Sequence, residues 1–174
     1  VTLRDGGVSL AILNYGATTR DWRVPLNGRP VPVVLGYADP VQYLHGTVFF
    51  GAIVGRVSNR IGGAQFSMNG QTLRLSPNDG GNQLHGGPVG LSNVFWEIEP
   101  DGPSAVRLRY VSPAGENGFP GQAKVTVDVQ LTGSCVTYDM RAEVDCVTPI
   151  SLAQHNYYNL AGGGSIWDHK LRCT

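Results

Sequence analysis

The sequence predicts an all-β fold, and three observations carry that prediction. From Lys124 to Leu131 apolar and polar residues alternate without a fault, which gives the two faces of a half-buried strand. Asn-Gly and Asp-Gly pairs recur between such stretches, and these residues supply the positive φ angles of tight hairpins. No window of eleven residues repeats its apolar positions every 3.6 residues, as a helix would. We therefore expect an antiparallel sandwich or a large barrel.

The expected strands can be placed along the chain by this alternation. It continues from Val136 to Cys146, and a shorter stretch runs from Val106 to Tyr110. β-Branched and aromatic residues on one face of each stretch are typical of half-buried antiparallel strands. Six shorter candidates are Val8–Leu13, Thr18–Val24, Val31–Leu35, Ala64–Met68, Gln71–Leu75 and Val94–Ile98.

Turn-forming pairs separate the expected strands. Asn69-Gly70, between Ala64–Met68 and Gln71–Leu75, is the strongest hairpin signal. The 24 glycines and 11 prolines agree with a chain of many turns and few long helices. Five more pairs lie between strand candidates: Asn27-Gly28, Asp79-Gly80, Asp101-Gly102, Asn117-Gly118 and Thr132-Gly133.

Length and charge limit the classes of protein and partner. A chain of 174 residues suits one ordinary domain or part of a larger one. Its 13 Lys and Arg residues balance 13 Asp and Glu residues, so no basic excess exists to hold nucleic acid or an acidic membrane surface. The longest apolar run, Val48 to Val54, is interrupted by glycine and is too short to cross a bilayer. We expect neither nucleic acid nor a membrane as a partner.

The three cysteines do not form a disulfide framework. Cys135 and Cys146 lie on one alternating stretch, and a single extended strand would hold them about 36 Å apart. Bonded cysteines require Cα atoms within about 7 Å. We therefore expect free, partly buried thiols in a reducing compartment, which favours a cytoplasmic location.

The last residues, Asp168 to Thr174, resemble the start of a strand with no closing turn. A sheet that ended in this way would expose an unpaired edge. We therefore expect the chain to be the first part of a longer protein.

Two polar segments are poorly explained as scaffold. Arg56, Asn59 and Arg60 directly follow the buried apolar run, and an arginine fork there suits hydroxyl or anionic oxygens. A solvated turn with a paired arginine is the alternative. In the segment from Asn78 to Pro88, glycines leave His85 accessible to a ligand, although a surface histidine would also fit.

Two further segments differ in what they favour. Ala114–Gly121 is sufficiently explained by its turn residues, so Glu116 is only a weak candidate for a functional role. In Leu152–Leu160 an extended chain places His155, Tyr157 and Asn159 on one face. Amides, an imidazole and tyrosine rings suit a sugar, whose hydroxyls and C–H faces they match. A satisfied core histidine is the alternative.

Several other chemistries lack their motifs. The sequence has no P-loop, and no G-x-G-x-x-G precedes a helix. The four histidines and three cysteines form no H-x-x-x-H, H-x-H or C-x-x-C pair, so zinc is unsupported. The absence of G-x-S-x-G argues against a serine hydrolase.

Six short motifs in a fixed order cover nearly the whole chain. They are Asn14-Tyr15-Gly16-Ala17, Val34-Leu35-Gly36-Tyr37, Gly51 to Ile61, Asn82 to Gly87, Gly118-Phe119-Pro120-Gly121 and His155 to Leu160. Any one of them is weak, but together they resemble the aldose 1-epimerase (galactose mutarotase) family.

The resemblance implies a large antiparallel β-sandwich, the galactose mutarotase-like supersandwich, whose concave face holds a monosaccharide. It implies an isomerase that interconverts the α and β anomers of a hexose through ring opening, with no metal or organic cofactor. His155 corresponds to the general acid, which protonates the ring oxygen while a carboxylate removes the anomeric hydroxyl proton. The resemblance also implies that His85 helps to hold and polarise the sugar, that Asn59 and Arg60 hydrogen-bond its hydroxyls, and that Tyr157 lies in the sugar-contacting part of the last motif.

The chain departs from the family in length and at two positions. Family members are about twice as long, and their catalytic glutamate and a sugar-binding aspartate lie in the half without a counterpart here. We therefore expect residues 1–174 to be the N-terminal part of a single, here incomplete, sandwich domain that is inactive alone. Gln154 and Asn156 replace the usual neighbours of the catalytic histidine, which leaves the preferred sugar open.

Two alternative functions remain at this point. A relative acting on a phosphorylated hexose could bind the phosphate through Arg56 and Arg60. A non-catalytic sugar-binding module would have kept the pocket and lost the base.

Overall fold

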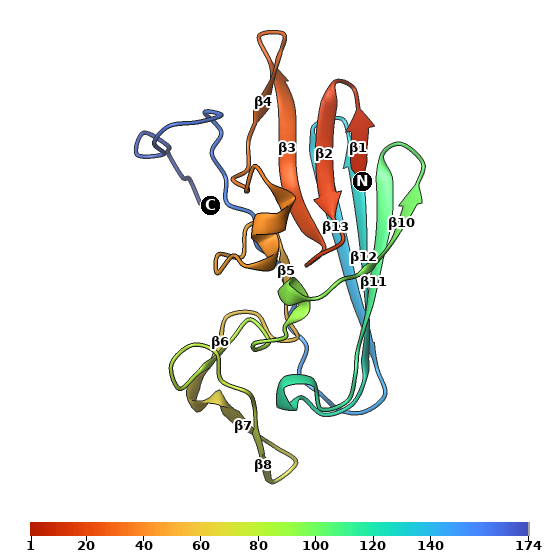
Figure 1. Ribbon diagram of the computed structural model, residues 1–174, viewed down its shortest axis with the longest axis vertical. Helices are drawn as coiled ribbons and strands as arrows, with labels where there is room; N and C mark the ends of the chain where they lie inside the picture. The colour runs from red at the N-terminus through yellow and green to blue at the C-terminus, as the bar shows by residue number, and fades with distance from the viewer. Residues whose placement is uncertain (174) are drawn as a thin grey trace.

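The computed structural model describes residues 1–173, and its first four strands form one antiparallel sheet. These are β1 (Thr2–Asp5), β2 (Val8–Leu13), β3 (Thr18–Leu26) and β4 (Arg29–Pro32), adjacent in space in the order of the chain (Figure 1). Short turns produce this order. At Asn27-Gly28 both residues have positive φ, 51° and 75°, as a two-residue hairpin turn requires.

The second sheet contains the strands with the clearest alternation. β10 (Glu97–Asp101), β11 (Ala105–Ser112), β12 (Ala123–Thr132) and β13 (Cys135–Val144) are again antiparallel neighbours in chain order. Every second residue of β12, beginning with its first, is buried. The period-two pattern of the sequence thus becomes one apolar face directed at the core and one polar face directed outward.

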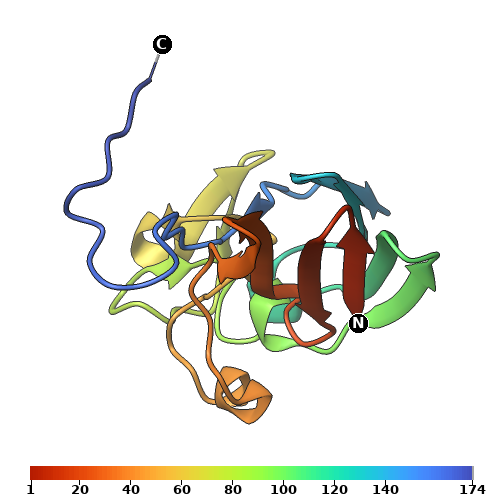
Figure 2. The ribbon, with the colours of Figure 1, turned by 90° about the horizontal axis from the view of Figure 1, so that it is seen from above.

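Three two-stranded ribbons connect and flank the sheets. They are β5 (Ile53–Val54) with β14 (Ala153–Gln154), β6 (Arg60–Ile61) with β9 (Gln83–Leu84), and β7 (Gln65–Met68) with β8 (Gln71–Arg74). Short 3₁₀ helices lie between strands: η1 (Pro40–Leu44), η2 (Gly62–Ala64), η3 (Leu91–Asn93) and η4 (Glu116–Gly118). Beyond β14 the chain first passes beside residues 33–35, where Tyr158 bridges Val34, and then runs away from the sheets without forming another strand up to residue 173 (Figure 2).

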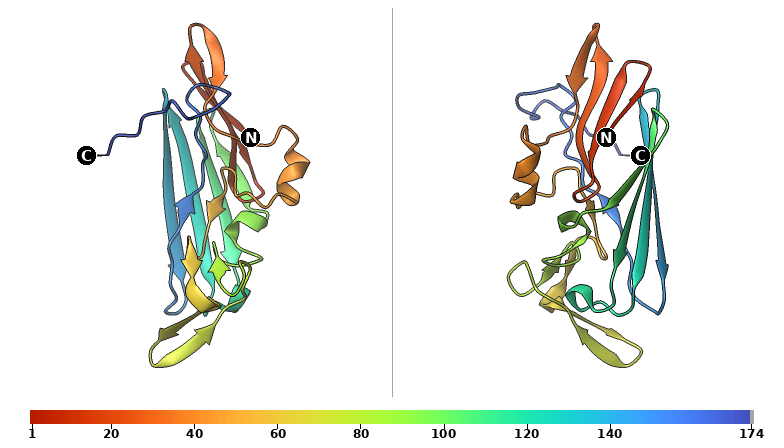
Figure 3. Two further views of the ribbon diagram at one scale, coloured as in Figure 1. Left: turned by 90° about the vertical axis from the view of Figure 1, so that its left-hand side faces the viewer. Right: turned by 45° about the vertical axis from the view of Figure 1, so that its right-hand side comes forward.

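The core lies between the two four-stranded sheets, which form separate layers (Figure 3). Leu3 and Leu10 from the first sheet belong to one buried cluster with Leu108 and Val127 from the second. All four are fully buried, and Trp96 at the entry to β10 joins them with 2% of its surface exposed. Burial of apolar surface between the layers is the main force holding them together.

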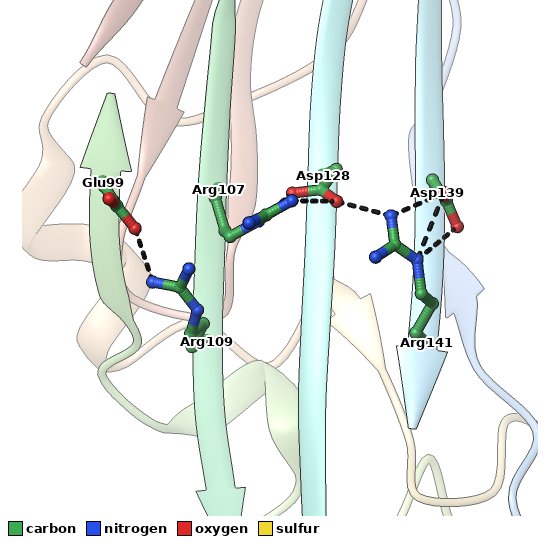
Figure 4. A network of polar contacts seen from close by, with 6 residues as sticks. All are labelled: Glu99, Arg107, Arg109, Asp128, Asp139 and Arg141. Carbon is green, nitrogen blue, oxygen red and sulfur yellow. Dashed lines mark hydrogen bonds and ion pairs between the residues drawn. The ribbon is translucent and has the colours of Figure 1, made fainter. Parts of the chain in front are cut away.

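The outer face of the second sheet carries a network of charged residues (Figure 4). Asp128 on β12 accepts hydrogen bonds from Arg107 at 2.5 Å and Arg141 at 2.7 Å, one on each neighbouring strand. The hydrogen bond from Arg107 is the largest of the effects that lower the pKa of Asp128. Exposed pairs of this kind are screened by solvent and contribute little, so the apolar face dominates the stability of the sheet.

The all-β prediction is confirmed, and the architecture is the sandwich rather than the barrel. Two expected strands are shifted. Where Val31–Leu35 was expected, β4 already ends at Pro32, and where Val94–Ile98 was expected, β10 begins only at Glu97. The residues left over make only isolated bridges, Val34 with Tyr158 and Phe95 with Tyr15.

Two expectations about the cysteines and the last residues are wrong. Cys135 and Cys146 are free but exposed, not partly buried, because they lie at the ends of the β13 segment, away from the core. Residues 168–173 form no strand, and Thr174 lies outside the described residues. Among residues 1–173, none of the helices has the length and apolar character needed to span a membrane.

Because the core lies between the sheets, truncating a side chain of β11 is expected to lower the stability of the protein strongly only on the inward face of the strand. Leu108→Ala is expected to lower the free energy of unfolding by about 2–5 kcal/mol, because it leaves a cavity between the sheets. Val111→Ala, on the exposed face of the same strand, is expected to cost less than about 1 kcal/mol. Urea unfolding followed by tryptophan fluorescence measures both, and similar losses would contradict the inward direction of Leu108.

Candidate active site

The two histidines named from the sequence lie against each other. The ring centroids of His85 and His155 are 5.0 Å apart, and the ring planes meet at 84°. His85 directly follows β9, and His155 directly follows β14. Seventy residues of chain separate them, so the fold itself brings them together.

Backbone hydrogen bonds fix the position of His155. Its N–H donates to the carbonyl of Ala52 at 2.9 Å, and its carbonyl accepts from the N–H of Gly51 at 3.0 Å. These bonds extend the pairing of β14 with β5. Gly51 has φ +64°, and a Cβ there would lie 2.0 Å from the carbonyl oxygen of Thr19, so only glycine lets this segment approach β3 so closely.

Aromatic rings surround the histidine pair. The ring of Phe49 lies 4.7 Å from that of His85 and 5.7 Å from that of His155. The ring of Tyr157 lies 5.2 Å from that of His155 and 5.1 Å from that of Phe50. Flat apolar rings beside imidazoles suit the C–H faces and hydroxyls of a pyranose.

Sequence reasoning did not single out Phe49 and Phe50, whose rings lie beside the histidine pair and Tyr157, because it treated Val48–Val54 as a buried apolar run. Both are only partly buried, whereas the residues that follow them, up to Val54, are buried. Two consecutive aromatic residues directly before a glycine were the signal that could have found them.

The environment of His85 keeps its imidazole neutral at ordinary pH. The backbone N–H of Asn59 donates to Nδ1 of His85 at 3.0 Å. Burial, then the neighbouring His155 and then Arg60 lower the pKa of His85 to about 4. A histidine with these neighbours is suited to hydrogen bonding rather than to carrying a positive charge.

Asn59 and Arg60 lie beside His85 because β6 pairs with β9. In that pairing Arg60 is opposite Leu84, the residue before His85. Both side chains are exposed, and Nε of Arg60 donates to Asp79 at 2.7 Å. The pair with Asp79 aligns the guanidinium, while the rest of it stays open to solvent.

Arg56 does not face a ligand, contrary to the interpretation of its segment as a binding loop. The side chain is 98% buried, since only 2% of its surface is exposed. Nε donates to the Ser112 hydroxyl at 2.8 Å, and Nη2 donates to the carbonyls of Ser112 at 3.0 Å and Pro113 at 2.9 Å. Nη1 donates to the carbonyl of Pro120 at 3.0 Å. The alternative of a paired structural arginine is the one observed.

Glu116 completes this buried arginine cluster. It accepts hydrogen bonds from the Tyr110 hydroxyl at 2.7 Å and from the Ser112 hydroxyl. The structural role expected for its segment is therefore what the structure has. Burial lowers the pKa of Arg56, but four hydrogen bonds and the nearby carboxylate compensate the loss of water.

The sequence predicted His155, Tyr157 and Asn159 on one face of an extended segment, and this is only partly observed. His155 and Tyr157 are neighbours, but Asn159 is buried and stabilises a turn. Its Nδ2 donates to the carbonyl of Gly164 at 3.0 Å, and its Oδ1 accepts from the N–H of Ala161 at 3.1 Å. Asn159 is thus satisfied by backbone groups.

Carboxylates are absent from the immediate contacts of the histidine pair. Within residues 1–173, neither imidazole forms a hydrogen bond or ion pair with Asp or Glu. The same part of the chain contains no group of three His, Cys, Asp or Glu side chains placed to hold a metal ion. The arrangement offers two imidazoles, an amide, a guanidinium and aromatic rings.

Solved structures share this fold. A crystal structure of an aldose epimerase homologue from C. elegans matches with a TM-score of 0.89 and 29% identity, over 94% of this chain and 51% of that one. Galactose 1-epimerase from Lactobacillus acidophilus matches with a TM-score of 0.78 and 30% identity, over 91% of this chain and 48% of that one. The fold is therefore the all-β sandwich of galactose mutarotase-like proteins.

Curated relatives narrow this to one family. The chain is 38% identical to galactose mutarotase of Sus scrofa in an alignment 174 residues long, which covers 97% of this chain and 50% of the relative. It is 38% identical to aldose 1-epimerase of Escherichia coli strain K12, over 99% of this chain and 51% of the relative. The aldose 1-epimerase family model matches residues 1–174, and the chain belongs to that family. It spans about half the length of these curated relatives.

The buried arginine cluster predicts a strong dependence of stability on Arg56. Arg56→Ala is expected to lower the free energy of unfolding by more than about 3 kcal/mol, because the buried carbonyls of Ser112, Pro113 and Pro120 lose their donor and Glu116 loses the nearby positive charge. The matched control is Arg23→Ala, which removes a partly exposed pair with Asp21 and is expected to cost less than about 1 kcal/mol. Urea unfolding compares them, and a small loss for Arg56→Ala would argue against a structural role.

Proposed function

We propose that this chain carries the histidine part of an aldose 1-epimerase active site, which interconverts the α and β anomers of a hexose. The observation that supports this most is the contact of His85 and His155, at 5.0 Å between ring centroids, in a member of that family. Phe49 and Tyr157 form the aromatic wall beside them. A monosaccharide is the proposed partner, with no metal or organic cofactor required by these residues.

The proposed reaction moves two protons and one C–O bond. Protonated His155 gives its proton to the ring oxygen while a carboxylate base takes the proton of the anomeric hydroxyl. The bond between the anomeric carbon and the ring oxygen breaks, and a free aldehyde forms. Rotation about the next C–C bond presents the other face of the aldehyde. As the ring closes, His155 takes its proton back from the attacking hydroxyl, and the base returns its proton to the new anomeric hydroxyl. His85, Asn59 and Arg60 hold the hydroxyls during this rotation.

The carboxylate base is proposed to come from outside residues 1–174. Two observations support this: no carboxylate of residues 1–173 contacts the imidazoles, and the chain spans about half the length of its relatives. We propose that residues 1–174 form the N-terminal part of a single sandwich domain whose C-terminal part supplies the base. Without that part the chain is expected to bind sugar but to show negligible turnover.

A cytoplasmic location is also part of the proposal. Cys135, Cys146 and Cys173 are free and exposed, which suits a compartment that keeps thiols reduced.

His155→Ala tests the catalytic proposal. In the whole natural protein, this change is expected to slow mutarotation of freshly dissolved α-D-glucose or α-D-galactose by about 10²- to 10⁴-fold, because the ring oxygen loses its proton donor. Polarimetry measures the rate, and intact mass establishes which residues the sample contains. His45→Ala is the matched control, since this histidine is exposed after η1, away from the pair. Full activity of His155→Ala would remove His155 from the mechanism, and sugar binding without turnover by the whole protein would favour the non-catalytic module.

A phosphorylated hexose is the less favoured substrate. Arg56, one of the two arginines that could meet a phosphate, is buried and fully hydrogen-bonded, and Arg60 already pairs with Asp79. We therefore expect a higher kcat/KM on glucose or galactose than on glucose 6-phosphate. Rates compared at equal concentrations decide this, and a preference for the phosphorylated sugar would reverse the assignment.

A further inference from the structure

Asn59 and His85 form a reciprocal pair of hydrogen bonds. The backbone N–H of Asn59 donates to Nδ1 of His85, and the backbone N–H of His85 donates to the carbonyl of Asn59, both at 3.0 Å. A backbone N–H can only donate, so Nδ1 must present its lone pair. In a neutral imidazole the single proton then lies on Nε2.

We propose that the backbone N–H of Asn59 locks His85 in its Nε2–H tautomer, so that His85 acts on the sugar only as a neutral hydrogen-bond donor. Asn59 is thereby a positioning residue that acts through its backbone. The assignment of a sugar as the acceptor rests on the proposed function, whereas the tautomer does not.

The local backbone is built to hold this geometry. Asn59 and His85 both have left-handed backbone conformations, with φ of 63° and 51°. Directly behind them, Arg60 pairs with Leu84. Gly86 follows with φ +87°, and a Cβ there would lie 1.7 Å from the carbonyl oxygen of Gly55. The loop after β9 is therefore closely packed on the Gly55 segment, which fixes the backbone that carries the imidazole, and the rings of Phe49 and His155 lie against the imidazole itself.

The surroundings of the ring oppose a second proton. Burial and the neighbouring His155 and Arg60 lower the pKa of His85 to about 4. Arg60 is itself paired with Asp79, which partly offsets its charge, and the remaining neighbour is the apolar ring of Phe49. A ring with one nitrogen occupied by a donor and no tendency to gain charge keeps one free function, the Nε2–H group.

This arrangement separates the roles of the two histidines. The lone pair of His85 is already used by Asn59, so His85 cannot accept a proton from a sugar hydroxyl without losing that bond. Nε2–H can still donate to a sugar oxygen before, during and after ring opening. His155 is left as the imidazole that transfers protons, which avoids competition between two adjacent acids.

Nitrogen NMR of ¹⁵N-histidine-labelled protein tests the tautomer directly. In the whole natural protein, the His85 ring is expected to show a protonated Nε2 and an unprotonated Nδ1, and to remain neutral from pH 8 down to about pH 5. The spectrum of His85→Gln assigns the signals. Asn59→Gly is expected to preserve the pattern, because glycine keeps the N–H and accepts positive φ. Asn59→Pro, which removes the N–H, is expected to give mixed tautomers.

Substitutions that place an amide at either ring nitrogen provide a second test if Asn59→Pro does not fold. The amide of Gln reaches about as far as Nε2, and that of Asn about as far as Nδ1. His85→Gln is therefore expected to bind the sugar about tenfold more tightly than His85→Asn, which is one hydrogen bond's difference. Titration of galactose followed by intrinsic fluorescence measures this.

The outcomes separate the tautomer lock from the function. An Nδ1–H form, mixed tautomers in the unsubstituted protein, protonation near pH 6.5, or equal sugar binding by His85→Gln and His85→Asn would each overturn the proposal. An Nε2–H ring in a whole natural protein that does not accelerate mutarotation would support the lock and remove the enzymatic function. Mixed tautomers in an active epimerase would remove the lock alone.

Discussion

The pairing of β14 with β5 is the contact on which the site depends. Two residues on each strand suffice, Ala153 opposite Val54 and Gln154 opposite Ile53. The chain returns there after building the whole second sheet, so roughly a hundred residues of loop are closed by this contact. The bonds of His155 with Gly51 and Ala52 extend the ladder by one step, and that step brings the imidazole to His85. A slip of one residue would direct the imidazole to the opposite face.

Arg56 holds in place the other segment of the candidate site, the one that carries Asn59. It lies three residues before Asn59, and its guanidinium is bound to carbonyls at both ends of the turn between β11 and β12. A buried guanidinium is a costly anchor, since it must be surrounded by acceptors before it stabilises anything. Its five donors in a fixed plane nevertheless specify one geometry for the loop that a lysine could not.

The sequence predicted most of the fold because alternation and turn residues act locally. β12 and the hairpin at Asn69-Gly70 follow from residues within a few positions of each other, and both are observed. The end of β4 was less predictable. Val34 is apolar enough to continue the strand, but in the structure it forms only an isolated bridge with Tyr158. Local pattern describes which residues can be strands, while neighbouring segments decide where pairing stops.

The sequence pointed to the two histidines of the candidate site but not to the residues around them. The motifs around His85 and His155 named the imidazoles, and the contact between them required the fold. The interpretation of Arg56 failed because nothing local distinguishes an arginine that binds a ligand from one that binds carbonyls sixty residues away. Phe49 was missed for the same reason. An aromatic residue in an apolar run can belong to the core or line a binding site, and the groups that face it in the fold decide which.

The two histidines differ most clearly in a hydrogen bond that the backbone supplies to one of them. Each imidazole lies beside the other, and Phe49 contacts both rings. What distinguishes them is that His85 receives a hydrogen bond from Asn59, while no such bond is formed to the ring of His155 within residues 1–173. A backbone donor cannot rotate away or change its charge with pH. The difference between the two rings is therefore built into the folded β6–β9 ribbon itself.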